Sequence, residues 1–195
     1  MQKVGVTGGI GSGKTLICRI FGVLGIPVFD ADREAKRLMT GDLGLVAAIT
    51  DAFGDEAYSA NGSLNRAYLA ETVFNNEAAR KRLNELVHPV VIRAGEEWAA
   101  AQHAPYTIKE AALLFESGSY KKNNYNILVT APEDLRIQRV MERDGTTERQ
   151  VRARMASQWP EEKKAAFADF IITNDGIQAL IPQVRKLHDF FLQLR

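Results

Sequence analysis

Residues 8–15 read Gly8-Gly9-Ile10-Gly11-Ser12-Gly13-Lys14-Thr15, which matches the phosphate-loop pattern G-x-x-x-x-G-K-[ST] at every fixed position. A short apolar run at 2–7 predicts a buried strand before the loop, and apolar residues at helical spacing follow it. The loop then joins a strand to a helix N-terminus, where backbone N–H groups favour an anion. We expect Lys14 to reach the phosphates of a nucleoside triphosphate and the Thr15 hydroxyl to ligate Mg²⁺.

Composition limits the class of protein. The chain has 195 residues, of which 46% are hydrophobic, so it forms one domain or one core with small inserted subdomains. A net charge of +1 gives no reason to expect general affinity for nucleic acid or for an anionic membrane. The one cysteine, Cys18, lies among apolar residues and is expected to be a buried thiol. Because no membrane-length apolar run or signal-peptide pattern is present, we expect a cytoplasmic protein.

Strand and helix patterns alternate at the two ends of the chain, which indicates a parallel α/β sheet. The predicted strands lie at 2–7, 26–29, 106–110, 126–130 and 170–173. Residues 32–101 between the second and third strands are nearly all helical, with breaks at Thr40–Leu43, Gly54–Ser63 and near Asn75–Asn76. One crossover requires fewer residues, so we interpret this stretch as an inserted substrate-binding region.

Two further helices are predicted near the C-terminal end. Pro132-Glu133-Asp134 opens one of them, with a proline and acids where a first turn favours them. The last helix is expected to place its apolar residues on one face: Ile177, Leu180, Ile181, Val184, Leu187, Phe191 and Leu194. Pro182 requires that this helix start later or bend.

Acidic side chains follow two predicted strands, at the edge where open parallel sheets bind ligands. Asp30 and Asp32 follow the second strand, and a carboxylate there can accept a proton from a hydroxyl or hold Mg²⁺ through water. Either one can instead cap a helix. Alternate side chains of an extended chain point the same way, so the spacing of Asp30 and Asp32 does not show which of them would accept the proton as general base. Glu110 ends the third strand, where many phosphate-loop proteins keep an acid linked to Mg²⁺.

Arginines at intervals of three and four residues occur in the segment 136–164. Arg136, Arg139 and Arg143 would share one helix face, and a planar guanidinium suits phosphate. A solvated helix surface is the other interpretation. Asp144-Gly145-Thr146-Thr147 then ends this helix and starts another, a layout that suits a mobile lid.

The histidines give weaker signals. His88 precedes Pro89 after a long amphipathic helix, as a hinge residue would. His103 and His188 are expected at the surface, and the sequence holds no His and Cys cluster with metal-ligand spacing.

Taken together, the motifs resemble the dephospho-coenzyme A kinase family from Val4 to about Leu194. The shared motifs are T-G-G-I-G-S-G-K (Thr7–Lys14), F-D-A-D (Phe29–Asp32), L-V-H-P (Leu86–Pro89), L-L-F-E (Leu113–Glu116), R-x-x-x-R-D (Arg139–Asp144), R-x-x-x-Q (Arg154–Gln158) and I-x-N-D-G (Ile172–Gly176). The set is far more specific than the phosphate loop alone. Two positions depart from the family pattern: Leu16 replaces a second Ser or Thr, and Glu110-Ala111-Ala112 replaces the usual D-[IV]-P.

The resemblance implies transfer of the γ-phosphoryl group of ATP to the ribose 3′-hydroxyl of dephospho-coenzyme A, the last step of coenzyme A synthesis. The residues implied at ATP are Gly11, Ser12, Gly13, Lys14, Thr15, Leu16, Asn174 and Gly176. Those implied at the acceptor are Asp32, His88, Phe115 and Glu116, with Asp32 as the general base. Arg139 and Arg143 match arginines on the lid side of the nucleotide, and Thr15 would hold Mg²⁺.

The implied fold is a three-layer phosphate-loop core with a five-stranded parallel sheet, a helical acceptor-binding insert and a helical lid. The core would comprise residues 1–31, 102–139 and 169–195, the insert 32–101 and the lid 140–168. We expect ATP and dephospho-coenzyme A as partners, Mg²⁺ as the metal, no nucleic acid or membrane, and a monomer or small homo-oligomer.

Two alternatives remain open. One is a phosphate-loop kinase for another small acceptor, which would share the loop and the lid. The other is a GTP-binding switch protein, which requires a guanine-reading N-K-x-D motif. Thr173-Asn174-Asp175-Gly176 has neither that lysine nor that spacing, which disfavours the second alternative.

Overall fold

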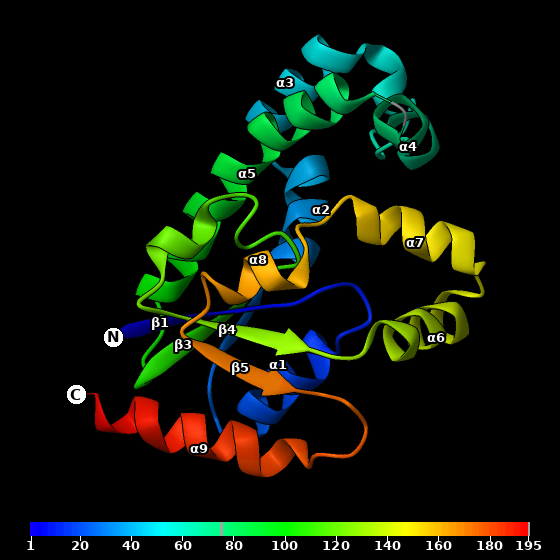
Figure 1. Ribbon diagram of the computed structural model, residues 1–195. Helices are drawn as coiled ribbons and strands as arrows, with labels where there is room; N and C mark the ends of the chain where they lie inside the picture. Colours follow the sequence, from blue (N-terminus) through cyan, green and yellow to red (C-terminus); the bar gives the residue numbers. More distant parts are fainter. Residues whose placement is uncertain (75, 195) are drawn as a thin grey trace. The chain divides into compact units, whose positions relative to one another are not determined.

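The computed structural model describes residues 1–74 and 76–194, and the chain divides into two compact units (Figure 1). The first unit contains residues 1–30 and the chain from Ala99 onward, and the second contains Ala31–Trp98. The phosphate loop belongs to the first unit, whereas Asp32 and His88 belong to the second.

The first unit is built on a parallel sheet of five strands in the order β2-β3-β1-β4-β5. The strands are β1 (Gln2–Thr7), β2 (Val28–Asp30), β3 (Tyr106–Glu110), β4 (Tyr125–Thr130) and β5 (Phe170–Thr173). Val6 of the central strand β1 pairs in register with Glu110 of β3 and with Ile127 of β4. The α/β fold class is confirmed, although β2 begins two residues later than predicted. The shared register brings the phosphate loop and Glu110 to one edge of the sheet.

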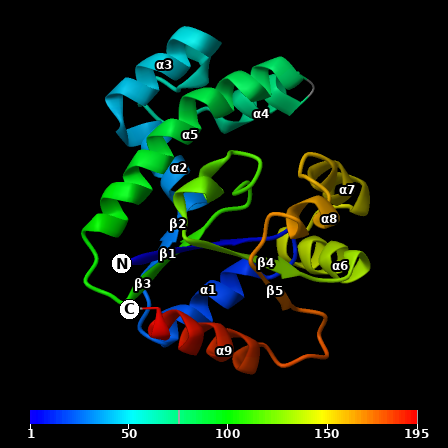
Figure 2. The same cartoon turned by 60° about the vertical axis from the view of Figure 1, so that its left-hand side comes forward.

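Helices cover both faces of this sheet (Figures 1 and 2). The helical elements of the unit are α1 (Lys14–Val23), the short 3₁₀ helix η2 (Ser119–Lys122), α6 (Glu133–Asp144), α7 (Glu148–Ala156), α8 (Glu161–Ala165) and α9 (Leu180–Gln193). Both views place α1 and α9 on one face and α8 on the other. The core between the sheet, α1 and α9 includes Val4, Phe21, Ile127 and Phe191, and Cys18 is buried there as predicted.

Local chemistry accounts for the ends of α6 and α7. Pro132 is the N-cap of α6, and Gly145 ends that helix in the left-handed conformation (φ 62°). Thr147 then caps α7 through a capping box with Gln150, which satisfies two backbone N–H groups. The predicted break at residues 144–147 is confirmed.

The beginning of the last helix differs from the prediction. α9 starts at Leu180 and places Pro182 in its first turn, where proline costs little. Ile177 lies outside the helix and is 90% exposed, and Ile181 in the first turn is 67% exposed. The buried residues of α9 start only at Val184, so the prediction that Ile177 and Ile181 belong to the buried face is wrong.

His188 is not the simple surface residue expected from the sequence. Its Nδ1 lies 2.6 Å from the hydroxyl oxygen of Tyr106, a residue of β3 with no exposed surface. Burial raises the pKa of the Tyr106 hydroxyl. The hydrogen bond gives the buried hydroxyl a partner, which such a group requires.

The second unit is helical apart from a short antiparallel bridge between Tyr58 and Leu64. Its elements are α2 (Ala31–Gly41), α3 (Leu43–Phe53), the 3₁₀ helix η1 (Asp55–Ala57), α4 (Arg66–Phe74) and α5 (Glu77–Ala100). Asp42 caps α3 by accepting a hydrogen bond from Leu45 N at 2.9 Å, which confirms the first predicted break. Gly54 ends α3 and confirms the second. Of the third break, Asn75 lies outside the described residues.

One prediction for this unit is wrong. His88 and Pro89 lie inside α5, not after it. An interior proline costs about 3 kcal/mol. Val87 and Val91 are both buried beside it, and burying a valine contributes about 1.5–3 kcal/mol. The side-chain burial therefore offsets the lost backbone hydrogen bond, and the helix continues.

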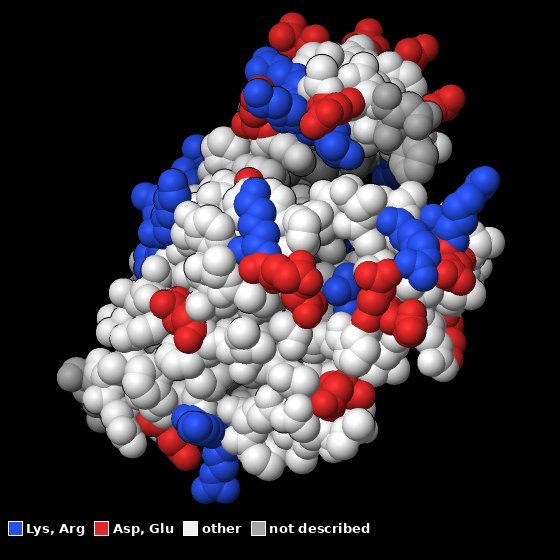
Figure 3. Space-filling view, in the orientation of Figure 1, with Lys and Arg blue, Asp and Glu red and all other residues white. Residues whose placement is uncertain are grey.

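The surface over α6 and α7 carries charges of both signs, with basic and acidic side chains intermixed (Figure 3). Arg152, for example, pairs with both Glu133 of α6 and Glu148 of α7. This face therefore presents no extended patch of one charge. None of the helices in the described part of the chain is both long and apolar enough to cross a membrane.

Candidate active site

The phosphate loop leads from β1 directly into α1. Gly13 adopts the left-handed conformation (φ 93°) at the N-cap of α1, and in the described structure no side chain caps this helix. A Cβ added at Gly13 would collide with the side-chain amide of Asn174. Only glycine satisfies both conditions. Lys14 and Thr15 are thus the first two residues of α1, at the end of the helix that favours anions.

Lys14 and Thr15 both have defined partners. Lys14 Nζ donates a hydrogen bond to the carbonyl oxygen of Gly8 at 2.9 Å. Thr15 Oγ1 donates to Glu110 Oε1 at 2.7 Å. Burial raises the pKa of the Glu110 carboxyl above its usual value, and the bond from Thr15 acts in the opposite direction. Hydroxyl and carboxylate oxygens are ligands that Mg²⁺ accepts, so this pair fits the magnesium site predicted at Thr15.

The other predicted ATP residues of the loop lie around its turn. Gly11 has a positive φ of 81°, which favours glycine. Leu16 N donates to Gly13 O at 3.0 Å, and its side chain is 48% exposed. Ser12 is fully buried, and its hydroxyl oxygen has no hydrogen-bond partner among residues 1–74 and 76–194. A buried polar atom of this kind is suited to a ligand that completes its bonding.

Asn174 and Arg139 approach the loop from the far end of the chain. Asn174 follows β5 and is buried, and its Nδ2 donates to Ser12 O at 2.8 Å. Arg139 of α6 donates to Asn174 O at 3.2 Å and to Asn174 Oδ1 at 3.3 Å. Gly176 (φ 83°) lies two residues further on, in a turn closed by Asp175. The structure therefore brings the predicted N-D-G loop and Arg139 to the phosphate loop.

Arg143 is arranged differently. Its Nε donates to Asp144 Oδ1 at 2.7 Å, and Arg154 of α7 donates to Asp144 Oδ2 at 2.8 Å. The two guanidinium groups hold the pKa of the Asp144 carboxyl well below its usual range, Arg143 with the larger effect. The described contacts thus join Arg143 to the end of α6, and not to the residues that support the loop.

Phe115 and Glu116 lie in the segment after β3. Phe115 is 2% exposed, and its ring packs against those of Tyr120 and Phe167. Glu116 Oε1 accepts a hydrogen bond from Trp159 N at 2.9 Å and pairs with Lys164 Nζ at 3.0 Å. The other oxygen, Oε2, is buried and lacks a hydrogen-bond partner within the described residues. It can accept a hydrogen bond from a ligand.

Two predicted residues belong to the second unit. Asp32 lies in the first turn of α2, two residues after β2 ends at Asp30. His88 is half-buried in α5, and burial lowers the pKa of its imidazole. The imidazole is therefore neutral at neutral pH.

Sequence reasoning did not reveal that Arg136 and Gln158 hold the phosphate loop. Gln158 Oε1 accepts a hydrogen bond from Ile10 N at 2.9 Å, and Arg136 Nε donates to Ile10 O at 3.1 Å. Both line a cavity of about 430 Å³ beside the loop, together with Gly9, Trp159 and Lys164. The R-x-x-x-Q motif and the arginine spacing had marked these residues without indicating what they contact.

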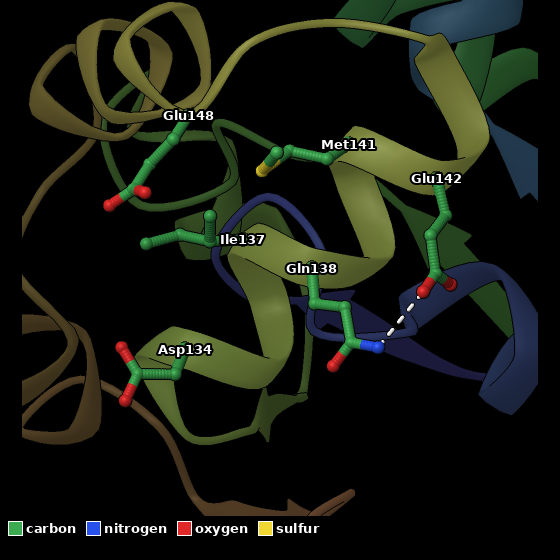
Figure 4. A pocket seen from close by; sticks show the side chains of 6 residues that line it. All are labelled: Asp134, Ile137, Gln138, Met141, Glu142 and Glu148. Atoms are coloured by element: carbon green, nitrogen blue, oxygen red, sulfur yellow. Dashed lines mark hydrogen bonds between the residues drawn. The ribbon is translucent and has the colours of Figure 1, made fainter.

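A separate pocket of about 350 Å³ lies between α6 and the start of α7. Figure 4 shows the side chains that line it: Asp134, Ile137, Gln138, Met141, Glu142 and Glu148. Gln138 Nε2 donates to Glu142 Oε1 at 2.9 Å within α6. The predicted site residues are all absent from this lining, so we do not assign the pocket to the site.

Known proteins resemble this chain in sequence and in fold. A protein from Thermus thermophilus, TT1252, superposes with a TM-score of 0.83 and 32% identity, covering 100% of this chain and 98% of that one. The dephospho-CoA kinase of Chlorobium chlorochromatii is 39% identical over 97% of this chain and 93% of its own length. That of Salinibacter ruber is 46% identical over 90% of each. The family model for dephospho-CoA kinase matches residues 2–179, which confirms the resemblance seen in the motifs. This chain belongs to the dephospho-CoA kinase family.

Proposed function

We propose that this chain transfers the γ-phosphoryl group of ATP to the ribose 3′-hydroxyl of dephospho-coenzyme A. The 3′ oxygen forms a bond to the γ-phosphorus as the bond from that phosphorus to the β–γ bridging oxygen breaks. The products are coenzyme A and ADP. The observation that carries this proposal is the supported phosphate loop at the start of α1, in a chain that belongs to the dephospho-CoA kinase family.

On the ATP side, residues 11–16 surround the triphosphate in this proposal. Lys14 stabilises the charge that moves onto the β–γ bridging oxygen, an electrostatic role that suits the loose transition state of phosphoryl transfer. The buried, unpartnered Ser12 hydroxyl in the described structure supports a phosphate contact at that residue. We place the adenine near Asn174 and Gly176, and Arg139 beside the nucleotide.

On the acceptor side, the helical insert 32–101 binds dephospho-coenzyme A and positions its 3′-hydroxyl. Asp32 accepts the hydroxyl proton as the phosphoryl group moves. His88, Phe115 and Glu116 border the acceptor, and the Oε2 atom of Glu116, unpartnered within the described chain, supports a hydrogen bond to an acceptor hydroxyl. Residues 140–168 form a lid that carries Arg143 and excludes water.

We further propose that Mg²⁺ binds with ATP, with Thr15 as its protein ligand and Glu110 holding the Thr15 hydroxyl. A bound Mg²⁺ neutralises charge on the β- and γ-phosphates. Glu110 ends β3, where family members usually have D-[IV]-P, so in this chain a longer acid supplies the carboxylate.

Glu110→Gln tests this role. The variant is expected to weaken the apparent Mg²⁺ affinity of the ATP complex by about 10–100-fold, as changes behind a metal ligand do. Because burial raises the pKa of Glu110, its ionised form costs stability at pH values above that pKa. The nucleotide-free variant should therefore have a higher Tm than the wild type at neutral pH, with the difference shrinking as the pH falls through the Glu110 pKa. Mg²⁺ titrations and thermal melts measure the two effects.

Glu142→Gln, at an exposed position of α6, is the matched control and should change neither quantity. An unchanged Mg²⁺ affinity in Glu110→Gln would remove Glu110 from the metal site.

The proposed reaction is tested by following ADP release with dephospho-coenzyme A and with a panel of nucleosides, nucleotides and sugars. We expect turnover with dephospho-coenzyme A and a product whose mass shows one added phosphoryl group, which NMR places at the 3′ position. Turnover only with a different acceptor would support the other phosphate-loop kinase. Preferential binding of GTP over ATP would support the switch protein instead.

We also propose a cytoplasmic enzyme that acts as a monomer or small homo-oligomer, without nucleic acid or membrane. The net charge of +1 supports the absence of a nucleic-acid partner. Size-exclusion chromatography with light scattering measures the oligomeric state.

A further inference from the structure

The backbone of Ile10 is held at both its N–H and its carbonyl oxygen. Its N–H donates to Gln158 Oε1 at 2.9 Å, and its carbonyl oxygen accepts from Arg136 Nε at 3.1 Å. Ile10 lies in the middle of the phosphate loop, between Gly9 and Gly11. Both holding groups come from the segment 136–158, far along the chain.

Gln158 is itself held in place by its neighbours. The next residue, Trp159, donates its backbone N–H to Glu116 Oε1 at 2.9 Å. Glu116 also pairs with Lys164 of α8, whose side chain is only 1% exposed. The corner between α7 and α8 is therefore fixed to a buried ion pair, and Gln158 reaches the loop from a fixed backbone.

Arg136 is fixed as well. It is 9% exposed, and its second contact is an ion pair with Glu161 Oε2 at 3.2 Å. A Cβ added at Gly9 would lie 2.6 Å from Arg136 Nη2. Gly9 occupies a variable position of the phosphate-loop pattern, yet in this chain a side chain there would require the Arg136 guanidinium to shift. Arg136 and the loop are thus closely packed on each other.

We propose that Gln158 is a positioning residue for ATP. By accepting the Ile10 N–H, it fixes the turn of the loop and so the direction of the backbone N–H groups that face the phosphates. It does not touch the nucleotide. This inference rests on one part of the proposed function, which is the binding of ATP at the phosphate loop. It does not depend on which acceptor receives the phosphoryl group, because Gln158 contacts the loop.

Three substitutions at residue 158 separate this role from general stability. Gln158→Met has a similar length and lacks the accepting oxygen. Gln158→Asn keeps an amide but is one methylene too short to reach Ile10. Gln158→Glu keeps an oxygen at the same reach. Gln138→Met is the matched control, since Gln138 is an exposed glutamine of α6 whose side chain donates to Glu142 of the same helix.

The measurements are the Kd for Mg²⁺·ATP by calorimetry, the KM for dephospho-coenzyme A, the Tm, and the exchange rate of the Ile10 amide by NMR. Because each variant loses one hydrogen bond to the loop, Gln158→Met and Gln158→Asn are each expected to weaken ATP binding about 3–10-fold. The Ile10 amide should exchange faster in both variants, while the KM for the acceptor stays at its wild-type value and the Tm falls by no more than about 4 °C, the cost of one hydrogen bond. Gln158→Glu should keep the Ile10 amide protected, and Gln138→Met should match the wild type throughout.

Wild-type ATP affinity in Gln158→Met and Gln158→Asn would overturn the proposal. A parallel loss of ATP binding and acceptor binding, with a fall in Tm well above about 4 °C, would also overturn it, because a structural defect affects all three. If the wild type fails to phosphorylate dephospho-coenzyme A, the proposed function fails, while the ATP titrations and the Ile10 amide still decide the role of Gln158.

Discussion

Replacing Lys14 with Met is expected to lower kcat/KM for phosphoryl transfer by about 10³-fold, the range seen when a group that stabilises developing charge is removed. Lys14 begins α1, and its ammonium lies 2.9 Å from Gly8 O, so it is held over the phosphate loop, which surrounds the triphosphate in the proposed function. Methionine has a similar length and no charge. Steady-state kinetics with ATP and dephospho-coenzyme A measure the effect.

Lys186→Met is the matched control for this prediction. Lys186 is an exposed lysine of α9, and its replacement should leave kcat/KM unchanged. Lys14→Arg should not restore activity, because the bulkier planar guanidinium cannot take the place of a compact ammonium near Gly8. Activity of Lys14→Met close to that of the wild type would contradict the assigned role.

Replacing Asp32 with Asn is expected to lower kcat by about 10²–10⁴-fold, the usual contribution of a general base. The amide cannot take the proton of the 3′-hydroxyl. ATP binding should survive, because the residues that support the phosphate loop belong to the first unit and Asp32 belongs to the second. The measurements are kcat under saturating substrates and the Kd for ATP.

Two neighbouring acids serve as controls for Asp32. Glu34 shares the first turn of α2 and bonds to Arg37, so Glu34→Gln should keep nearly full turnover. Asp30 pairs in register with Glu110, and Asp30→Asn is expected to act on Mg²⁺ dependence more than on kcat. Near-normal turnover of Asp32→Asn would remove Asp32 as the base, and a large loss of kcat in Asp30→Asn would assign that role to Asp30.

The sequence predicted most of the fold because its signals are local. The apolar run of β1, the Pro132 start of α6 and the Gly145 break each depend on neighbouring residues, and each is confirmed. The bounds of β3 and β5 match the prediction as well. Backbone preference and side-chain spacing act over a few residues, so they can be recognised in one dimension.

The wrong predictions have a common physical cause, which is burial decided by distant parts of the chain. Pro89 normally ends a helix, but buried valines keep α5 intact around it. Ile177 and Ile181 fit the apolar pattern of α9, yet the core that α9 covers starts at Val184. His188 looks like an exposed polar residue, and only the fold reveals its partner Tyr106.

The candidate site shows the same division. The phosphate loop and the motifs around it were found from the sequence, because their residue types and spacing are specific. The contact of Gln158 with Ile10 spans 148 positions, and that of Asn174 with Ser12 spans 162. No spacing rule reaches so far, so the groups that hold the loop required the structure.

The position of β1 in the sheet has a consequence for synthesis of the protein on the ribosome. β1 is made before its partners in β3, which follow only after the entire second unit. At about 5–20 residues per second, a ribosome takes roughly 5–20 s to go from Val4 to Glu110. During that time Val4 and Val6, which have no exposed surface in the finished protein, lack their neighbours in the sheet. The nascent chain must keep this apolar segment from aggregating until translation supplies them, and the phosphate loop gains its hydrogen bond from Asn174 only when that residue emerges.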